Sequence, residues 1–172
     1  EYMAIKPTGE FKSEKDFVRK CILDSGLWTS FLTRPYSKIP SPDSEPASIF
    51  ITAIDTEPLC PRPDLIINED LSAFNVGVER IASLTKGKVF LCKEEGRDLE
   101  VKNYESYDFK GPHPAGLAGT HMHFLDPPST NKIVWSIGYQ DVLAIGRLFL
   151  TGFLDPERTI SICGLLAKSL RI

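Results

Sequence analysis

The sequence predicts an α/β fold of three layers, in which helices cover both faces of a mostly parallel sheet. Short, nearly continuous apolar runs recur along the chain, which is typical of strands buried on both faces. They lie at residues 48–54, 89–92, 133–137 and 159–163. Segments with apolar residues at helical spacing stand between them. This alternation of strand and helix patterns indicates a parallel α/β sheet.

The helices have recognisable ends. Ser13 is a candidate N-cap with Asp16 at the third helical position, and Gly26 can end this first helix in a left-handed turn. The second helix is expected to begin at Asn68 and to end near Gly87. A third spans 139–152, with its apolar residues on one side.

Two further strand predictions complete the sheet. Residues 99–102 alternate between apolar and charged side chains, as an edge strand does. The central strands lack polar alternation, so their aliphatic residues should be buried on both faces. The residues expected to line them are Ile49, Ile51, Val89, Leu91, Ile160 and Ile162.

The chain of 172 residues has the composition of a globular protein. Its charge and its apolar runs exclude some classes of function. A net charge of −3 argues against a general nucleic-acid binder, because nothing offsets phosphate repulsion. No apolar run approaches the roughly 20 residues of a membrane span. Lacking an initiator Met, the chain is expected to be a piece of a longer protein. In that interpretation 1–164 form the α/β domain, and 165–172 start a following domain or a tail.

The four cysteines lie far apart and form no C-x-x-C pair. Cys21, Cys92 and Cys163 fall in apolar helix or strand patterns, where cysteine acts as a small hydrophobic residue. An iron–sulfur centre or a zinc ribbon is therefore not expected, and a reducing compartment fits best.

Residues 28–38, called here the aromatic–cationic segment, are the main candidate for ligand binding. Trp28, Phe31 and Tyr36 offer flat apolar area, while Arg34 and Lys38 offer positive charge. Such a segment can hold a flat, electron-poor ring by stacking and hydrogen bonding. The alternative, which composition alone favours, is a loop packed on the core with two cations that reach the solvent.

Acidic and imidazole groups form a second set of candidates. Asp55 and Glu57 follow a buried strand, where α/β proteins place their sites. All three histidines lie in one loop-and-helix stretch, 111–123, in which Pro114 suits the first helical turn. A zinc site would need a fourth group, with Asp126 as the candidate. We expect local hydrogen bonding without a metal instead. The candidate site-lining residues are Asp55, Glu57, His113, His121 and His123.

Several sequence blocks together resemble the A subunit of the Na⁺-translocating NADH:quinone oxidoreductase. The blocks are residues 25–38, 48–50, 55–59, 113–124 and 139–146. More distantly, the layout is similar to the flavin-binding subunit of respiratory complex I and to the C subunit of the Rnf complex. Those relatives cradle the flavin phosphate in a glycine-rich loop, whereas residues 27–32 here carry Trp, Phe and Leu. The comparison therefore predicts a Rossmann-like redox fold whose nucleotide site has been filled in.

The resemblance implies a peripheral, cytoplasm-facing subunit of a bacterial sodium pump at the inner membrane. It would contact the membrane subunits, especially the B subunit, and ubiquinone, and would carry no redox cofactor of its own. Flavins, iron–sulfur groups and NADH would belong to other subunits, and the isolated fragment would be inactive. The alternatives are an autonomous flavin- or dinucleotide-binding oxidoreductase and a purely structural assembly module. The quinone-binding residues would be Trp28, Phe31, Leu32, Thr33, Arg34, Pro35, Tyr36, Ser37 and Lys38.

Overall fold

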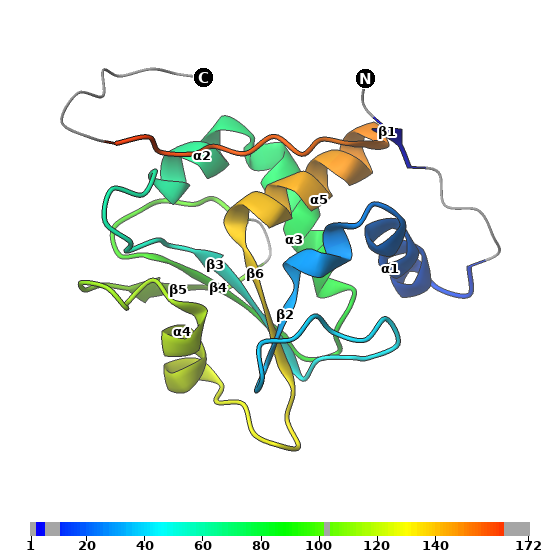
Figure 1. Ribbon diagram of the computed structural model, residues 1–172, viewed down its shortest axis with the longest axis horizontal. Coiled ribbons are helices and arrows are strands. Elements are labelled where there is room, and N and C mark those ends of the chain that lie inside the picture. The colour runs from blue at the N-terminus through cyan, green and yellow to red at the C-terminus, as the bar shows by residue number, and fades with distance from the viewer. Residues whose placement is uncertain (1–2, 6–10, 102–103, 164–172) are drawn as a thin grey trace.

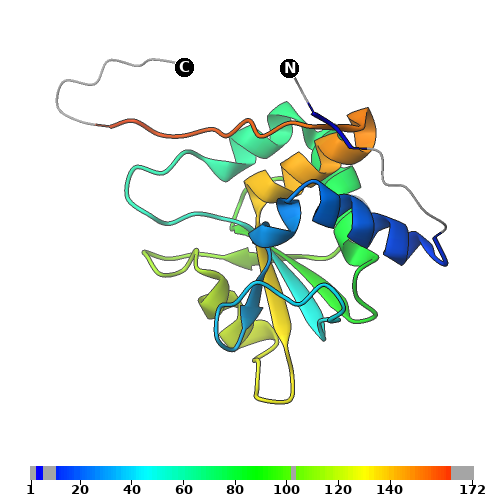
Figure 2. The same cartoon turned by 45° about the vertical axis from the view of Figure 1, so that its right-hand side comes forward.

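The computed structural model describes residues 3–5, 11–101 and 104–163 and confirms a three-layer α/β domain with a mostly parallel sheet (Figures 1 and 2). The five strands lie in the order β2-β6-β3-β4-β5, and only β2 runs antiparallel to its neighbour. Their bounds are β2 Leu32–Arg34, β3 Ser48–Ala53, β4 Lys88–Glu94, β5 Ser106–Phe109 and β6 Val134–Gly138. A separate pair joins β1 (Met3–Ala4) to β7 (Phe153–Leu154).

Helices cover both faces of the sheet unequally. The larger core cluster lies between the sheet and α1 (Glu14–Asp24), α3 (Leu71–Ala82) and α5 (Tyr139–Thr151). On the opposite face α4 (Ala118–Leu125) packs over β3. Along β3, Ile49 and Ile51 belong to the larger cluster, whereas Phe50 belongs to the smaller one. Burial on both sides explains why the strand sequences are apolar without alternation.

Helices α3 and α5 approach each other at backbone distance. A Cβ atom on Gly146 would lie 1.7 Å from the carbonyl oxygen of Ala73, and one on Gly77 would lie 2.2 Å from that of Val142. Each helix thus supplies a glycine where the other helix needs room. This contact fixes α3 and α5 as one layer above the sheet.

The predicted ends of the first and last helices are confirmed. The Ser13 hydroxyl accepts a hydrogen bond from the Asp16 amide, and Gly26 follows α1 with φ +79°. Gly152 closes α5 with φ +76°. The cap prediction at Asn68 is wrong. A separate helix, α2 (Pro63–Glu69), occupies that region, and the Asp70 carboxylate caps α3.

Two strand predictions are also wrong. Residues 99–101 form no strand, while Leu99 and Val101 pack against the core, and the edge strand is β5 instead. Residues 159–163 are extended but pair with no strand, and Ile160, Ile162 and Cys163 are exposed. Ile49, Ile51, Val89 and Leu91 do lie in central strands, as predicted. Residues 165–172 lie outside the described part of the chain.

No helix in the described part of the chain is both long enough and apolar enough to cross a membrane.

Candidate functional site

The order of the strands defines a topological switch point at one edge of the sheet. After β3, the chain builds β4 and β5 on one side and later places β6 on the other side of β3. In open α/β sheets, ligands bind outside the carboxyl ends of the strands at such a switch point. Here the switch point lies between residues 55–57, which follow β3, and Tyr139–Asp141, which follow β6; we use the word crevice for the region between these two segments. We call this end the carboxyl edge.

The turn after β3 is tied to the loop before α4. The Asp55 carboxylate accepts a hydrogen bond from the Glu57 amide at 2.9 Å. The Thr56 hydroxyl accepts one from the Gly116 amide at 2.9 Å and lies 3.4 Å from His113 Nδ1. A Cβ atom on Gly116 would lie 2.7 Å from the Thr56 nitrogen, so the close contact requires glycine. The structure thus brings His113 beside the turn that holds Asp55 and Glu57.

His121 supports this loop from beneath. Its side chain is fully buried, and Nε2 donates to the Ala115 carbonyl at 2.8 Å, while the ring centroid lies 4.2 Å from that of Phe109. Burial lowers the pKa of His121, which keeps the imidazole neutral at neutral pH. Nδ1 is buried without a hydrogen-bond partner. The ring therefore has a structural contact and no access to solvent.

The histidines do not converge on a common point. His123 is exposed on α4 and contacts Phe124, whereas His121 is buried, since residues two apart on a helix point in different directions. Asp126, the candidate fourth ligand, accepts a hydrogen bond from Ser48 and pairs with Lys132. In the ranges that the structure describes, no three His, Cys, Asp or Glu residues are grouped to hold a metal ion.

The other wall of the crevice is the start of α5. Tyr139 is largely buried, and its hydroxyl accepts a hydrogen bond from Gln140 Nε2 at 3.2 Å. Burial raises the pKa of the Tyr139 phenol. Asp141, in the first turn, accepts a hydrogen bond from Ser30 at 2.7 Å and pairs with Arg158. A carboxylate here satisfies the positive end of the helix, which a phosphate group would otherwise neutralise.

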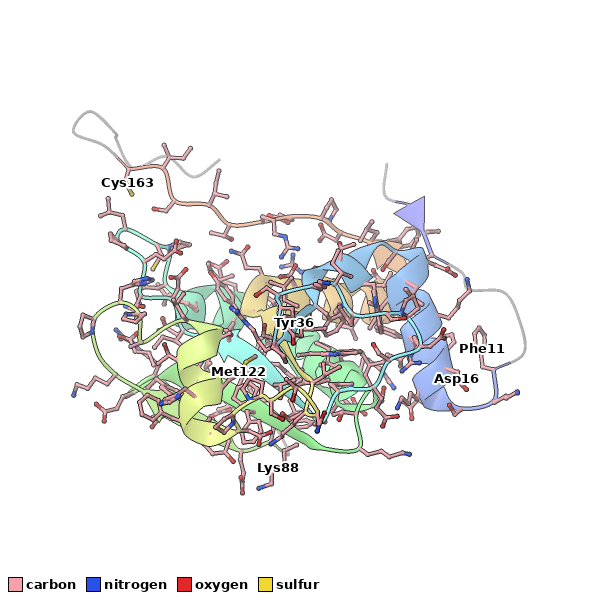
Figure 3. All side chains as sticks on the ribbon, turned by 60° about the horizontal axis from the view of Figure 1, so that its bottom comes forward. Phe11, Asp16, Tyr36, Lys88, Met122 and Cys163 are labelled. Carbon is pink, nitrogen blue, oxygen red and sulfur yellow. The ribbon has the colours of Figure 1, made fainter. Side chains whose placement is uncertain are left out.

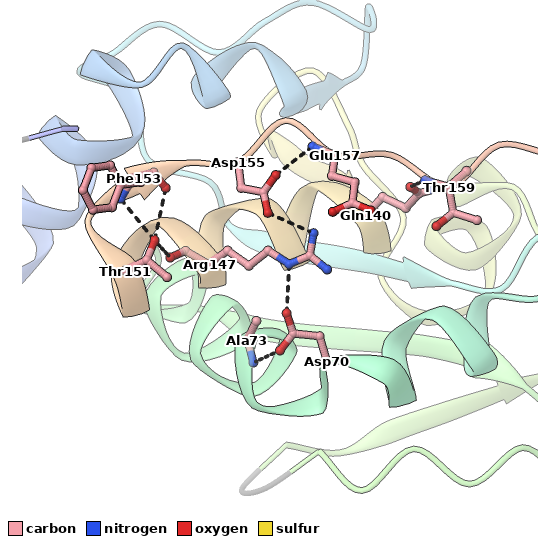
Figure 4. Close-up of polar contacts among 9 residues, drawn as sticks. All are labelled: Asp70, Ala73, Gln140, Arg147, Thr151, Phe153, Asp155, Glu157 and Thr159. Atoms are coloured by element: carbon pink, nitrogen blue, oxygen red, sulfur yellow. Dashed lines mark hydrogen bonds and ion pairs between the residues drawn. The ribbon is translucent and has the colours of Figure 1, made fainter. Parts of the chain in front are cut away.

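Residues 155–163, called here the strap, run along α5 past its first turn (Figure 4). The Gln140 side chain pairs with the Thr159 backbone, since Nε2 donates to the carbonyl at 3.0 Å and Oε1 accepts from the amide at 2.8 Å. Arg147 pairs with Asp70 at 2.8 Å and with Asp155 at 3.5 Å. The chain's own polar groups therefore occupy the switch point.

A thiol also lies beneath the crevice. Cys60 Sγ donates to the Asp55 carbonyl at 3.5 Å. Burial raises the pKa of Cys60, and the Asp55 carboxylate raises it further, so the thiol stays protonated at neutral pH. A protonated thiol is a poor nucleophile, and the Cys60 thiol contacts the backbone of the turn after β3.

The structure divides the aromatic–cationic segment between the two edges of the sheet. Residues Leu27–Ser30 form a short 3₁₀ helix, η1, beside the start of α5. Trp28 and Phe31 are 4% and 0% exposed and pack against Trp135, with ring centroids 5.5 Å apart. The Trp28 indole donates to the Pro40 carbonyl at 2.9 Å. These two rings thus belong to the core.

From Phe31 the antiparallel strand β2 carries the chain to the opposite edge, where Arg34 lies beside Val134 at the start of β6. We call this end the amino edge. Tyr36, labelled in Figure 3, is 73% exposed. Tyr36 and Ser37 have φ values of +83° and +47°. The Thr33 amide holds the turn by donating to the Lys38 carbonyl at 2.7 Å. Positive φ angles in non-glycine residues are strained and cluster at functional sites.

The cations of this turn lack carboxylate partners. Arg34 Nε is buried without a hydrogen-bond partner, and no ion pair joins Arg34 or Lys38 to a described residue. Leu32, Ser37 and Lys38 are exposed, while Thr33, Arg34 and Pro35 are half-buried. The exposed part of the segment is therefore an amino-edge turn with unpaired positive charge and one free aromatic ring.

Sequence reasoning missed the closure of the crevice. Ser30, Gln140, Asp141 and Arg158 meet there through side-chain contacts between distant parts of the chain. A local signal existed only for Asp141, which follows a buried strand at the third position of a helix. For Arg158, nothing in the neighbouring sequence indicates its partner.

Comparison with known proteins gives one consistent family. Residues 13–154 match the family model described as the NqrA second alpha/beta domain. Three relatives are named as the A subunit of the Na(+)-translocating NADH-quinone reductase. The protein from Vibrio alginolyticus is 48% identical over 162 residues, which cover 92% of this chain and 36% of the relative. That from Neisseria gonorrhoeae (strain NCCP11945) is 45% identical, covering 100% and 39%, and that from Saccharophagus degradans is 53% identical, covering 83% and 33%. The chain spans about a third of the length of these relatives.

Proposed function

We propose that this chain serves in a Na⁺-translocating NADH-quinone reductase, because it belongs to the NqrA family, which comprises the A subunits of these respiratory complexes. Within that family it corresponds to the second α/β domain. It works at the cytoplasmic face of the bacterial inner membrane, within a peripheral subunit. It contributes to ubiquinone binding and to assembly with the membrane subunits, the B subunit above all. Electron transfer from NADH and Na⁺ transport are activities of the whole complex.

The amino-edge turn carries the proposal for quinone binding. Arg34 and Lys38 have no carboxylate partner among the described residues, and Tyr36 offers an open ring beside them. A quinone needs hydrogen-bond donors for its carbonyl oxygens and an aromatic face for its electron-poor ring. Trp28 and Phe31 fix the segment to the core, while residues 32–38 contact the quinone. The strained backbone at Tyr36 and Ser37 fits a turn shaped for a ligand.

The strap supports a domain without its own redox cofactor. A flavin or dinucleotide would use the crevice at the carboxyl edge, with its phosphates at the start of α5. Asp141, Arg158 and the Gln140–Thr159 pair fill that place with bonds inside the chain. Flavins, iron–sulfur groups and NADH then belong to other subunits of the complex.

The test uses Arg34→Ala in the full-length subunit or the assembled complex. A charged donor to a quinone carbonyl contributes about 1.5–3 kcal/mol, so quinone affinity should fall at least about tenfold. Arg34→Lys should restore part of the loss, because it keeps the charge without the planar fork. Lys110→Ala, which removes an exposed cation far along the chain, is the control and should leave affinity unchanged. Unchanged affinity in a folded Arg34→Ala protein contradicts the proposed quinone site.

Cofactor content and the quinone affinity of Arg34→Ala separate the two other candidate functions. The switch-point crevice favours an autonomous flavin or dinucleotide domain, because this fold binds such cofactors there. That candidate requires a yellow protein with stoichiometric flavin, or a stoichiometric dinucleotide. A purely structural assembly module requires normal assembly and unchanged quinone affinity in Arg34→Ala.

A further inference from the structure

A groove with both aliphatic and charged lining residues lies between α2 and the strap, apart from the amino-edge turn. We call it the α2 groove; it has a volume of about 500 Å³ and is lined by residues 61, 62, 65, 66 and 69, in and just before α2, and by strap residues 157–160 and 162. Its lining includes Leu65, Ile160 and Ile162, which are 53%, 70% and 64% exposed. Large aliphatic side chains gathered in one concave surface mark a binding site more often than scattered ones do.

Ile160 and Ile162 are exposed while neighbouring strap residues bond to the rest of the domain. Gln140 holds the backbone of Thr159, and Cys163 Sγ lies 3.8 Å from the Leu59 carbonyl. In an extended chain, residues two apart share a side, so Ile160 and Ile162 point the same way. Figure 3 shows Cys163 at the end of the molecule farthest from Phe11 and Asp16. The exposed aliphatic side is thus held in place.

The charges around the groove are not balanced. Arg62 is paired with Asp64 at 2.5 Å, and Arg158 is paired with Asp141. No ion pair joins Glu69 or Glu157 to a described residue, although both line the groove. Both arginines of the groove therefore have carboxylate partners, whereas its two glutamates have no cationic partner among the described residues. An occupant of this groove should carry aliphatic side chains together with Lys or Arg.

We propose that the α2 groove docks an aliphatic segment with a basic residue, from the remaining part of the same NqrA polypeptide. In the relatives, more than half of the length lies outside the part that this chain matches. A tethered segment binds at an effective concentration near millimolar, so a small groove suffices. A second copy or a separate subunit would need an interface of about 800 Å² per partner. This proposal rests on family membership and is independent of quinone binding.

Hydrogen exchange tests the proposal by comparing this 172-residue chain with the full-length subunit. Amides in residues 59–69 and 157–163 should exchange at least about tenfold more slowly in the full-length subunit. Those of α4 around Phe124, which is 71% exposed and outside the groove, should be unchanged. Leu65→Gln removes an aliphatic side chain from the groove without changing its charge, and should return the exchange of 157–163 to the rate of the shorter chain. Phe124→Gln is the matched control and should not.

Three results overturn the proposal. Equal exchange in the shorter chain and the full-length subunit would mean that the groove is empty. Slower exchange that appears in the shorter chain as its concentration rises would identify a second copy as the occupant. Slower exchange that appears only in the assembled complex would identify another subunit. None of these results depends on quinone, so they are separate from the Arg34 test.

Discussion

The two edges of the sheet differ in how their polar groups are used. At the carboxyl edge Ser30, Asp141, Arg158, Gln140 and Thr159 are bonded to one another. At the amino edge the positively charged turn is strained and largely unpaired. The fold alone would direct attention to the carboxyl edge, where α/β domains bind their ligands. The contrast teaches that topology alone does not tell which edge keeps unpaired polar groups; here the amino edge keeps them.

The largest expected effect tests whether both edges share one core. Ile51 is fully buried in β3, between β4 and β6. Ile51→Ala should lower the free energy of unfolding by about 2–5 kcal/mol, because it removes buried methyl groups and leaves a cavity. Urea unfolding followed by tryptophan fluorescence measures this loss. Leu65→Ala, at an exposed position, is the control and should cost little. A loss near zero for Ile51→Ala would place β3 at the periphery.

An intermediate effect is expected where the strap is fastened. The Asp70 carboxylate caps α3 through the Ala73 amide and also pairs with Arg147, which holds Asp155. Asp70→Ala removes both contacts and should cost about 1–2 kcal/mol. Asp70→Asn keeps the cap and should cost less than about 1 kcal/mol. In both variants, hydrogen exchange should rise in the strap and stay unchanged at residues 32–38. Equal acceleration at both edges would contradict the difference between them.

The smallest effect is a pH dependence from His121. The folded protein lowers the pKa of His121 by burial, whereas the unfolded chain has a value near 6.5. Below about pH 6.5 the unfolded state binds a proton that the folded state resists, so the free energy of unfolding decreases as the pH is lowered. Above about pH 6.5 both states are neutral at this residue, and the stabilising contribution of the buried imidazole is fully present. His121→Gln cannot titrate and retains a donor for Ala115. The stability difference between the two proteins should therefore shrink from about pH 7.5 to about pH 5.5.

Two outcomes would contradict this account of His121. A constant difference across the pH range would mean that the imidazole is hydrated in the folded state. One tightly bound zinc per chain, lost on His121→Ala, would contradict the expectation of a structural, metal-free histidine. Elemental analysis of the purified protein measures the metal content.

Most of the fold follows from local patterns in the sequence. The central strands are apolar on both faces, and α1 and α5 carry their caps in the neighbouring residues. The strap could not be recognised, because Thr159–Cys163 has the β-branched and apolar composition of a strand. Whether such a segment enters a sheet depends on partners elsewhere in the chain. Here the five-stranded sheet does not include the strap, and Gln140 bonds the strap backbone at the surface.

The candidate site can be predicted only in parts. The sequence indicates Asp55 and His113 as site-lining residues, and the turn after β3 does meet His113 through Thr56. The 3.4 Å contact joins residues 57 positions apart, which no local pattern indicates. The strained turn is also hidden, since Tyr36 and Ser37 are not residue types that favour positive φ. The burial of Trp28 and Phe31 follows from the alternative interpretation of that segment, a loop packed on the core.

The reciprocal glycines of α3 and α5 restrict how the sequence of this domain can drift. Most outward-facing positions of the two helices can change one at a time without moving the backbone. Gly77 and Gly146 cannot change in this way, because the backbone of the opposite helix occupies the place where a side chain would stand. A single methyl group at either position forces the helices apart, and no change at the other glycine restores the fit. An evolutionary path that replaces one of them therefore requires the whole helical layer to be rebuilt.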